Sequence, residues 1–125
     1  MTARAAVSRP DAAQLTGPVL DAQRAMLLEA QRLEHAQVTE LQQTIDELTG
    51  QKDGDSLLER EVAERSRAVA LERVGDIEAA LDRVDRGVYG ICERCTRPIA
   101  LARLEVMPYA RYCVDCSAPA AQLFG

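Results

Sequence analysis

The four cysteines of this chain limit how it can fold more than any other feature of the sequence. They form two C-x-x-C pairs, Cys92/Cys95 and Cys113/Cys116, with seventeen residues between the pairs. Each pair can present two sulfur atoms from one tight turn, and two such turns complete a tetrahedron around Zn²⁺. Four thiolates leave no coordination position open for water or substrate, so we expect one structural zinc ion per chain.

Two disulfides, or a thioredoxin-like redox pair, are the alternatives to zinc. The first residues, MTARAAVSRPDAAQLTG, contain no continuous apolar segment, so we expect a flexible tail over residues 1–17 and no secretory signal. No run of 18 or more apolar residues follows, so nothing is expected to span a membrane. We therefore expect a cytoplasmic protein, and paired cysteines in the cytosol more often bind metal than form disulfides.

Two long helices are predicted before the cysteines. Pro18 suits the first turn of a helix, and Gly50 suits the residue just past its end. Ser56, followed three residues later by Glu59, matches the capping box that starts a helix. This second helix should end just before Gly87, because glycine commonly follows the last helical turn.

The apolar positions of both helices predict that they pack on each other. They recur at coiled-coil spacing: Val38, Leu41, Ile45 and Leu48 in the first helix, and Ala63, Ala70, Ile77 and Val84 in the second. Polar residues interrupt the first seam further back, at Arg24, Gln31 and Glu34, which disfavours a long symmetric dimer, so we expect a monomer. We predict an all-α fold, with a long antiparallel helical hairpin over residues 18–86, a tip loop at about 50–56, and a four-cysteine zinc-finger module over 87–125.

The charge distribution makes the finger a poor DNA reader and indicates that the tip of the hairpin is the working end of the protein. From Gly87 onward there are four basic and three acidic residues, and the tail after Cys116 has no basic residue, although GATA-type DNA-binding fingers share the cysteine spacing. Seven acids and two bases lie between Asp46 and Glu64. We expect the acids near the loop, Asp53, Asp55 and Glu59, to bind a basic or metal-bearing partner. No nucleophile–base pair, open metal site or phosphate loop supports an enzyme.

Three segments together form a recognisable pattern: IEAALDRVDRGVYGICERC, the sequence RPI…RLE…P that follows it, and the second pair YCVDC. They resemble the DksA/TraR family of bacterial RNA polymerase regulators. The resemblance covers about residues 57–117. It implies a zinc-stabilised base and a coiled-coil hairpin that enters the secondary channel of RNA polymerase, where its acidic tip modulates initiation without contacting promoter DNA. The alternative is a zinc-anchored helical adaptor that binds another protein through the same hairpin.

The resemblance also predicts differences from typical family members. The family's tip pattern, D-x-x-D-x-A, would fall on Thr49, Lys52 and Gly54, so the tip of this chain is atypical. Three positions at which some members bind the alarmone ppGpp through basic side chains correspond to Asp76, Met107 and Ser117. Because none of these is basic, we expect weak or absent dependence on ppGpp.

Overall fold

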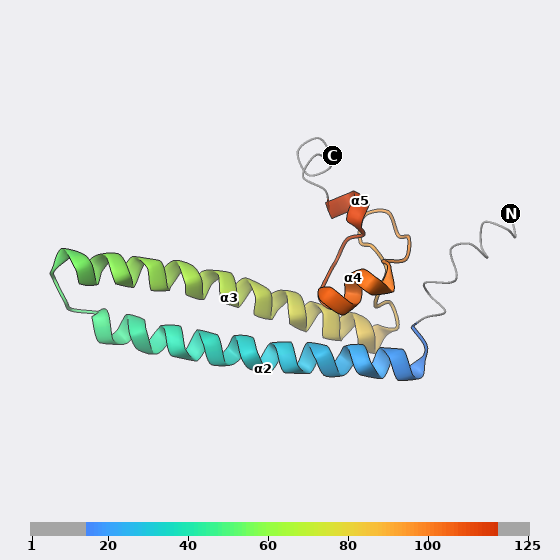
Figure 1. Ribbon diagram of the computed structural model, residues 1–125, viewed down its shortest axis with the longest axis horizontal. Coiled ribbons are helices and arrows are strands. Elements are labelled where there is room, and N and C mark those ends of the chain that lie inside the picture. The colour runs from blue at the N-terminus through green and yellow to red at the C-terminus, as the bar shows by residue number, and fades with distance from the viewer. Residues whose placement is uncertain (1–14, 118–125) are drawn as a thin grey trace, which may run out of the picture. The chain divides into compact units, whose positions relative to one another are not determined.

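The computed structural model describes residues 15–117, and this part of the chain is helical (Figure 1). Two long helices precede two short ones: α2 (Gly17–Leu48), α3 (Gly54–Arg86), α4 (Leu101–Val106) and α5 (Val114–Ser117). No strand occurs between residues 15 and 117, where an isolated antiparallel bridge joins Ile91 to Pro98. The predicted fold class, a helical hairpin with a four-cysteine cluster near its C-terminus, is confirmed.

The start of α2 agrees with the prediction to within one residue. Its first helical hydrogen bond runs from the Leu20 N–H to the Thr16 carbonyl, at 2.7 Å. Pro18 therefore lies in the first turn, where a helix does not need the missing N–H. The predicted flexible tail, residues 1–17, falls outside the described residues except for its last three positions.

The chain divides into two compact units. The hairpin unit is Glu29–Glu78, and the finger unit combines Met1–Leu28 with Ala79–Gly125. In the hairpin unit, α2 and α3 run antiparallel and are joined by a loop over residues 49–53 (Figure 1). Its buried side chains are Ile45, Ala63, Ala70, Val74 and Ile77.

The predicted inner face of α3 is confirmed. Ala63, Ala70 and Ile77 are buried in the hairpin unit, and Val84 is buried in the finger unit. Small residues at such positions let neighbouring helices approach closely. The seam of α2 is less regular, because only Ile45 of its four predicted positions is buried and the others are half-buried.

The start of α3 differs from the prediction. Ser56 does not cap this helix; α3 begins at Gly54, and Asp53 is the capping residue. The Ser56 N–H donates to Asp53 Oδ2 at 2.9 Å, and the Leu57 N–H donates to the Asp53 carbonyl at 3.1 Å. These bonds are those of an N-cap aspartate. The loop is therefore shorter than the predicted 50–56.

Helix α3 ends at Arg86, just before Gly87, as predicted. Gly87 has a φ of +76°, its N–H donates to the Val84 carbonyl, and the Val88 N–H donates to the Arg83 carbonyl. This pair of bonds is a Schellman motif, which requires a left-handed residue just past the helix and so favours glycine. The chain then turns directly into the first cysteine pair.

Candidate metal centre and partner-binding tip

The first cysteine pair lies in a tight turn closed by backbone hydrogen bonds. The Cys92 N–H donates to the Arg97 carbonyl and the Thr96 N–H donates to the Cys92 carbonyl, both at 2.9 Å. The Cys95 N–H points at Cys92 Sγ, 3.5 Å away. Thr96 has a φ of +63°, a conformation that costs a non-glycine residue roughly 1–2 kcal/mol. The closed turn holds this residue in place and aims both sulfur atoms to one side.

The second pair begins at Cys113 and continues into α5. The Ser117 N–H donates to the Cys113 carbonyl at 3.0 Å, so Cys116 lies on the single turn of this helix. Arg103 of α4 supports the turn, since its Nε donates to the Tyr112 carbonyl at 2.9 Å and its Nη2 donates to Ser117 Oγ at 3.2 Å.

The two pairs converge. The Sγ atoms of Cys92, Cys95, Cys113 and Cys116 all lie within 4.8 Å of one another, and all four cysteines are free of disulfides. The Cys95 and Cys113 sulfurs are 3.8 Å apart. A tetrahedron with Zn–S bonds of about 2.3 Å has edges of about 3.8 Å, whereas a disulfide bond is about 2.05 Å long. The donor set and its spacing therefore fit a tetrahedral metal ion.

The electrostatics of the cluster favour a bound cation. Burial raises the pKa of Cys92, but backbone N–H groups, chiefly those of Cys95 and Cys113, outweigh this effect and bring the pKa to about 6. Burial and the neighbouring thiols raise the pKa of Cys116 to about 12. Arg97 Nε donates to Cys95 Sγ at 3.4 Å and lowers the pKa of this thiol. Four thiolates this close repel one another, and a divalent cation removes that repulsion.

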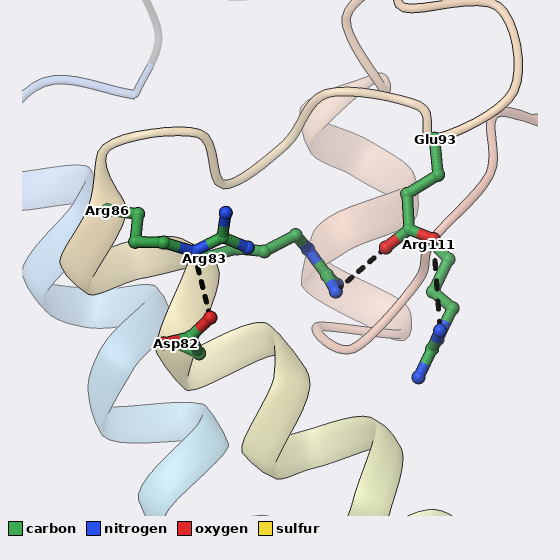
Figure 2. A network of polar contacts seen from close by, with 5 residues as sticks. All are labelled: Asp82, Arg83, Arg86, Glu93 and Arg111. Carbon is green, nitrogen blue, oxygen red and sulfur yellow. Dashed lines mark hydrogen bonds and ion pairs between the residues drawn. The ribbon is translucent and has the colours of Figure 1, made fainter.

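An ion pair between the buried Arg83 and the exposed Glu93 ties α3 to the finger (Figure 2). The side chain of Arg83 is 6% exposed, and its Nη1 donates to Glu93 Oε2 at 3.1 Å. Arg111 approaches the other oxygen of Glu93 at 3.8 Å, while Asp82 and Arg86 form a separate exposed pair on α3. Burial lowers the pKa of Arg83, and the charge of Glu93 opposes this shift. Glu93 lies between the first two cysteines, so this contact also positions their turn.

A second buried polar contact was not predicted from the sequence. Gln23 of α2 is 2% exposed, and its Nε2 donates to Tyr89 Oη at 3.1 Å and to the Leu104 carbonyl at 2.9 Å. The Tyr89 hydroxyl in turn donates to the Pro108 carbonyl at 2.7 Å. The sequence offers only a glutamine one helical turn before Leu27, which the structure shows to be fully buried. This signal is too weak to identify the contact.

The small core of the finger is only partly the predicted one. Ile99 and Leu104 are buried as expected, whereas Tyr109 and Tyr112 are half-buried and Tyr89 is buried. Gly90 lies against this core with a φ of +86°, and a Cβ at this position would be 2.5 Å from Leu15 Cδ1. The positive φ therefore favours glycine here, whereas the end of the flexible Leu15 side chain can shift.

The predicted tip residues lie together around the start of α3. Asp53, Asp55 and Glu59 are all exposed. Hydrogen bonds from the Ser56 N–H and hydroxyl lower the pKa of Asp53, which is thus engaged in capping the helix. Asp55 and Glu59 lie in the first two turns of α3 and remain accessible to a partner.

Among residues 15–117, no helix is long and apolar enough to cross a membrane.

The fold and the cluster define a class: a helical-hairpin protein with a four-cysteine zinc finger. Residues 87–120 match the family described as the prokaryotic dksA/traR C4-type zinc finger. Residues 87–120 therefore carry a finger of the DksA/TraR type, and the resemblance to this family predicted from the sequence is confirmed.

Individual relatives agree with this assignment. The chain is 41% identical over 61 residues to the RNA polymerase-binding transcription factor DksA of Caulobacter vibrioides, covering 49% of this chain and 40% of that protein. It is 34% identical over 64 residues to an uncharacterized protein of Aquifex aeolicus, covering 51% and 44% of the two chains. These matches thus span less than half the length of the curated relatives.

A solved structure extends the similarity to the whole fold. The structure of transcription factor DksA2 from Pseudomonas aeruginosa superposes with a TM-score of 0.80 at 25% sequence identity, over 92% of each chain. The similarity therefore includes the first helix, which precedes the residues 57–117 that carry the sequence resemblance.

Proposed function

We propose that this protein is a cytoplasmic transcription regulator that binds bacterial RNA polymerase directly and is not an enzyme. Its hairpin enters the secondary channel of the polymerase, and its tip modulates initiation without contacting promoter DNA. The observation that carries the proposal is the fold match over 92% of the chain to a transcription factor of the same family. The relative from Caulobacter vibrioides, named for RNA polymerase binding, supports the choice of partner.

The proposed zinc site has a structural role. Cys92, Cys95, Cys113 and Cys116 hold one Zn²⁺ per chain, a role supported by the spacing of their sulfurs and by the family of the finger. When bound, the ion would cross-link the two cysteine turns and take no part in a reaction. Glu93, held by Arg83, keeps the first turn in place against α3.

The proposed tip uses Asp55 and Glu59 as its exposed charges, with Asp53 serving mainly as the helix cap. The tip differs from the family pattern, because Thr49 and Lys52 occupy the loop at the expected aspartate positions. The positions matching the ppGpp-binding side chains, Asp76, Met107 and Ser117, lack positive charge, so the proposed dependence on ppGpp is weak or absent.

The test measures binding of the zinc-loaded protein to RNA polymerase core enzyme. The functional readout is the lifetime of the open promoter complex. The Asp53→Asn, Asp55→Asn double variant removes two tip charges and keeps an amide that can still cap α3. We expect it to bind within about threefold of wild type, equivalent to about 0.6 kcal/mol, and to lose most of the lifetime effect. The matched control, Glu72→Gln with Glu78→Gln, removes two exposed charges of α3 away from the tip.

Four outcomes would contradict this proposal in different ways. If the wild type does not bind the polymerase, the adaptor alternative replaces it. Binding with no lifetime effect from wild type or variant would remove the regulatory role of the tip. Equal losses of the lifetime effect in the tip variant and in the control would mean that the effect depends on total charge and not on the tip. A lifetime effect that requires added ppGpp would contradict the proposed weak or absent dependence.

A further inference from the structure

One face of the hairpin unit carries a groove between α2 and α3. It consists of two adjoining hollows, of about 540 Å³ and about 410 Å³, which share Ser66. Leu33, Gln37 and Val69 line the first hollow, and Leu41, Leu58 and Val62 line the second. All of these residues belong to the hairpin unit.

The groove gathers the exposed apolar side chains of this unit. Six large hydrophobic residues between Glu29 and Glu78 are exposed, and four of them line the groove: Leu33, Leu58, Val62 and Val69. Single exposed apolar residues are normal on a protein surface, whereas several gathered in one hollow favour an interaction site.

The dimensions of the groove match a helix. On α2 the lining runs from Leu33 to Thr44, about 16 Å of helix axis, and on α3 it runs from Leu58 to Arg73, about 22 Å. An α-helix of about 11–15 residues has this length. A helix with apolar residues at every third or fourth position would place them in the groove, as in other helix-in-groove complexes.

Acidic residues outnumber basic ones around the groove, where Arg65 lies three residues after Val62 and pairs with Glu61. Glu34 and Glu59 line it, with Arg73 paired to Glu34 at 3.8 Å. Glu40 lies three residues after Gln37 and four before Thr44, so it shares their face of α2. Asp55 lies three residues before Leu58, on the same face of α3 as the groove. The only basic residue among the lining side chains of these two hollows is Arg73.

The charge of the unit decides between two occupants. Residues 29–78 contain thirteen acidic and six basic side chains, a net charge of −7, whereas the whole chain carries −5. A second copy in the groove would place −7 against −7, and such like-charge contact opposes association. A helix with Lys or Arg beside its apolar face is attracted to both the groove and its rim.

We propose that the groove lined by Leu33, Leu58, Val62 and Val69 binds a basic amphipathic helix of a partner protein. This surface is distinct from the tip loop, although Glu59 contributes to both. The proposal does not depend on the partner being RNA polymerase, because it rests on the groove and on the charge of the hairpin unit.

The test measures binding of two fluorescein-labelled helical peptides of about 15 residues to the zinc-loaded full chain by fluorescence anisotropy. Both peptides carry leucines on one face; one has lysines on the flanks and the other glutamates. We expect saturable binding of the lysine peptide, weakened by added salt, and binding of the glutamate peptide at least about tenfold weaker.

The variants assign binding to the groove. Leu58→Ser with Val62→Ser should weaken binding of the lysine peptide at least about tenfold, because both apolar contacts are lost. The matched control is Leu57→Ser with Leu71→Ser, since these leucines are 50% and 49% exposed but line neither hollow. The control should change the affinity less than about twofold. All four positions are exposed, and circular dichroism checks that each variant keeps its helices.

Several results would overturn the proposal. One is the absence of saturable binding by the lysine peptide, and another is equal binding of both peptides. Equal losses from the groove pair and the control pair would show that the site lies elsewhere. Self-association in sedimentation experiments that the Leu58→Ser, Val62→Ser variant abolishes would assign the groove to a second copy. Because the peptide assay contains no polymerase, its failure is separate from a failure of the proposed function.

Discussion

At the scale of single residues, two buried polar side chains connect separate segments of the finger unit. Gln23 and Arg83 are the buried polar or charged residues among positions 15–117. Gln23 contacts Tyr89 and the Leu104 carbonyl, 66 and 81 positions away, and Arg83 contacts Glu93, 10 positions away. A buried donor or acceptor that loses its partner is more costly than an exposed one, so we expect these positions to be sensitive to substitution.

Gln23→Leu should lower the free energy of unfolding by about 1–3 kcal/mol, because Tyr89 and the Leu104 carbonyl lose a buried donor. Urea unfolding of the zinc-loaded protein measures this change. Gln43→Leu, at an exposed position of α2, is the control and should stay within about 0.5 kcal/mol of wild type.

A double-mutant cycle with Tyr89→Phe separates the hydrogen bond from packing. We expect a coupling energy of about 0.5–1.5 kcal/mol between positions 23 and 89, since the two side chains are in direct contact. Strict additivity, or a Gln23→Leu effect no larger than that of the control, would contradict this role.

At the scale of the elements, the start of α3 determines the form of the tip. Asp53 caps the helix, so Gly54 and Asp55 belong to its first turn and the loop is confined to residues 49–53. Sequence patterns could not choose between Asp53 and Ser56, because both residue types are favoured N-caps and they lie three residues apart. The hydrogen bond from the Ser56 N–H to Asp53 shows which residue caps the helix.

Asp53→Ala should lower the Tm of the protein by about 2–6 °C, whereas Asp53→Asn should retain most of the wild-type value because asparagine also caps helices. The helix-capping hydrogen bonds hold the pKa of Asp53 below its ordinary value of 3.8. The carboxylate therefore stabilises the fold above that pH, and this contribution is lost as the pH falls through the lowered pKa.

Thermal unfolding between pH 7 and pH 2 measures this dependence. The difference in Tm between wild type and Asp53→Ala should shrink as the pH falls below about 4. A difference that stays constant, or an Asp53→Asn variant as unstable as Asp53→Ala, would mean that Asp53 does not act as the cap.

At the scale of the whole molecule, the two units depend on different forces. The hairpin unit is held by a narrow apolar seam of alanines with Ile45, Val74 and Ile77. The finger unit has a small core around Leu27, Ile99 and Leu104, and its four cysteines add the proposed metal ion. Structural zinc contributes about 10–16 kcal/mol in small fingers, which is far more than such a core supplies.

Removing zinc with a chelator should therefore unfold the finger while most of the helix content remains. All three tyrosines, Tyr89, Tyr109 and Tyr112, lie in this segment, so near-ultraviolet circular dichroism reports on it directly. Far-ultraviolet circular dichroism should change little, because α2 and α3 contain most of the helical residues. Cys116→Ser should behave like the chelated protein. An unchanged tyrosine signal after zinc loss would contradict a structural role of the ion.

The sequence alone determined the features that depend on neighbouring residues. The cysteine spacing predicted the four-sulfur cluster, Gly50 and Gly87 marked the helix ends, and the seven-residue spacing from Ala63 to Ile77 identified the inner face of α3. These features follow from turn geometry and helical periodicity, which act over a few residues. The family resemblance rested on the same local motifs.

Only the tertiary structure decided which side chains meet across long separations. Gln23 is buried because it faces Leu104, 81 positions away, and nothing near Gln23 in the sequence specifies that contact. Leu33 and Leu58 look like core residues by type, yet they remain exposed and line the groove. Burial depends on how separate helices pack, and a pattern read along one helix does not contain that information.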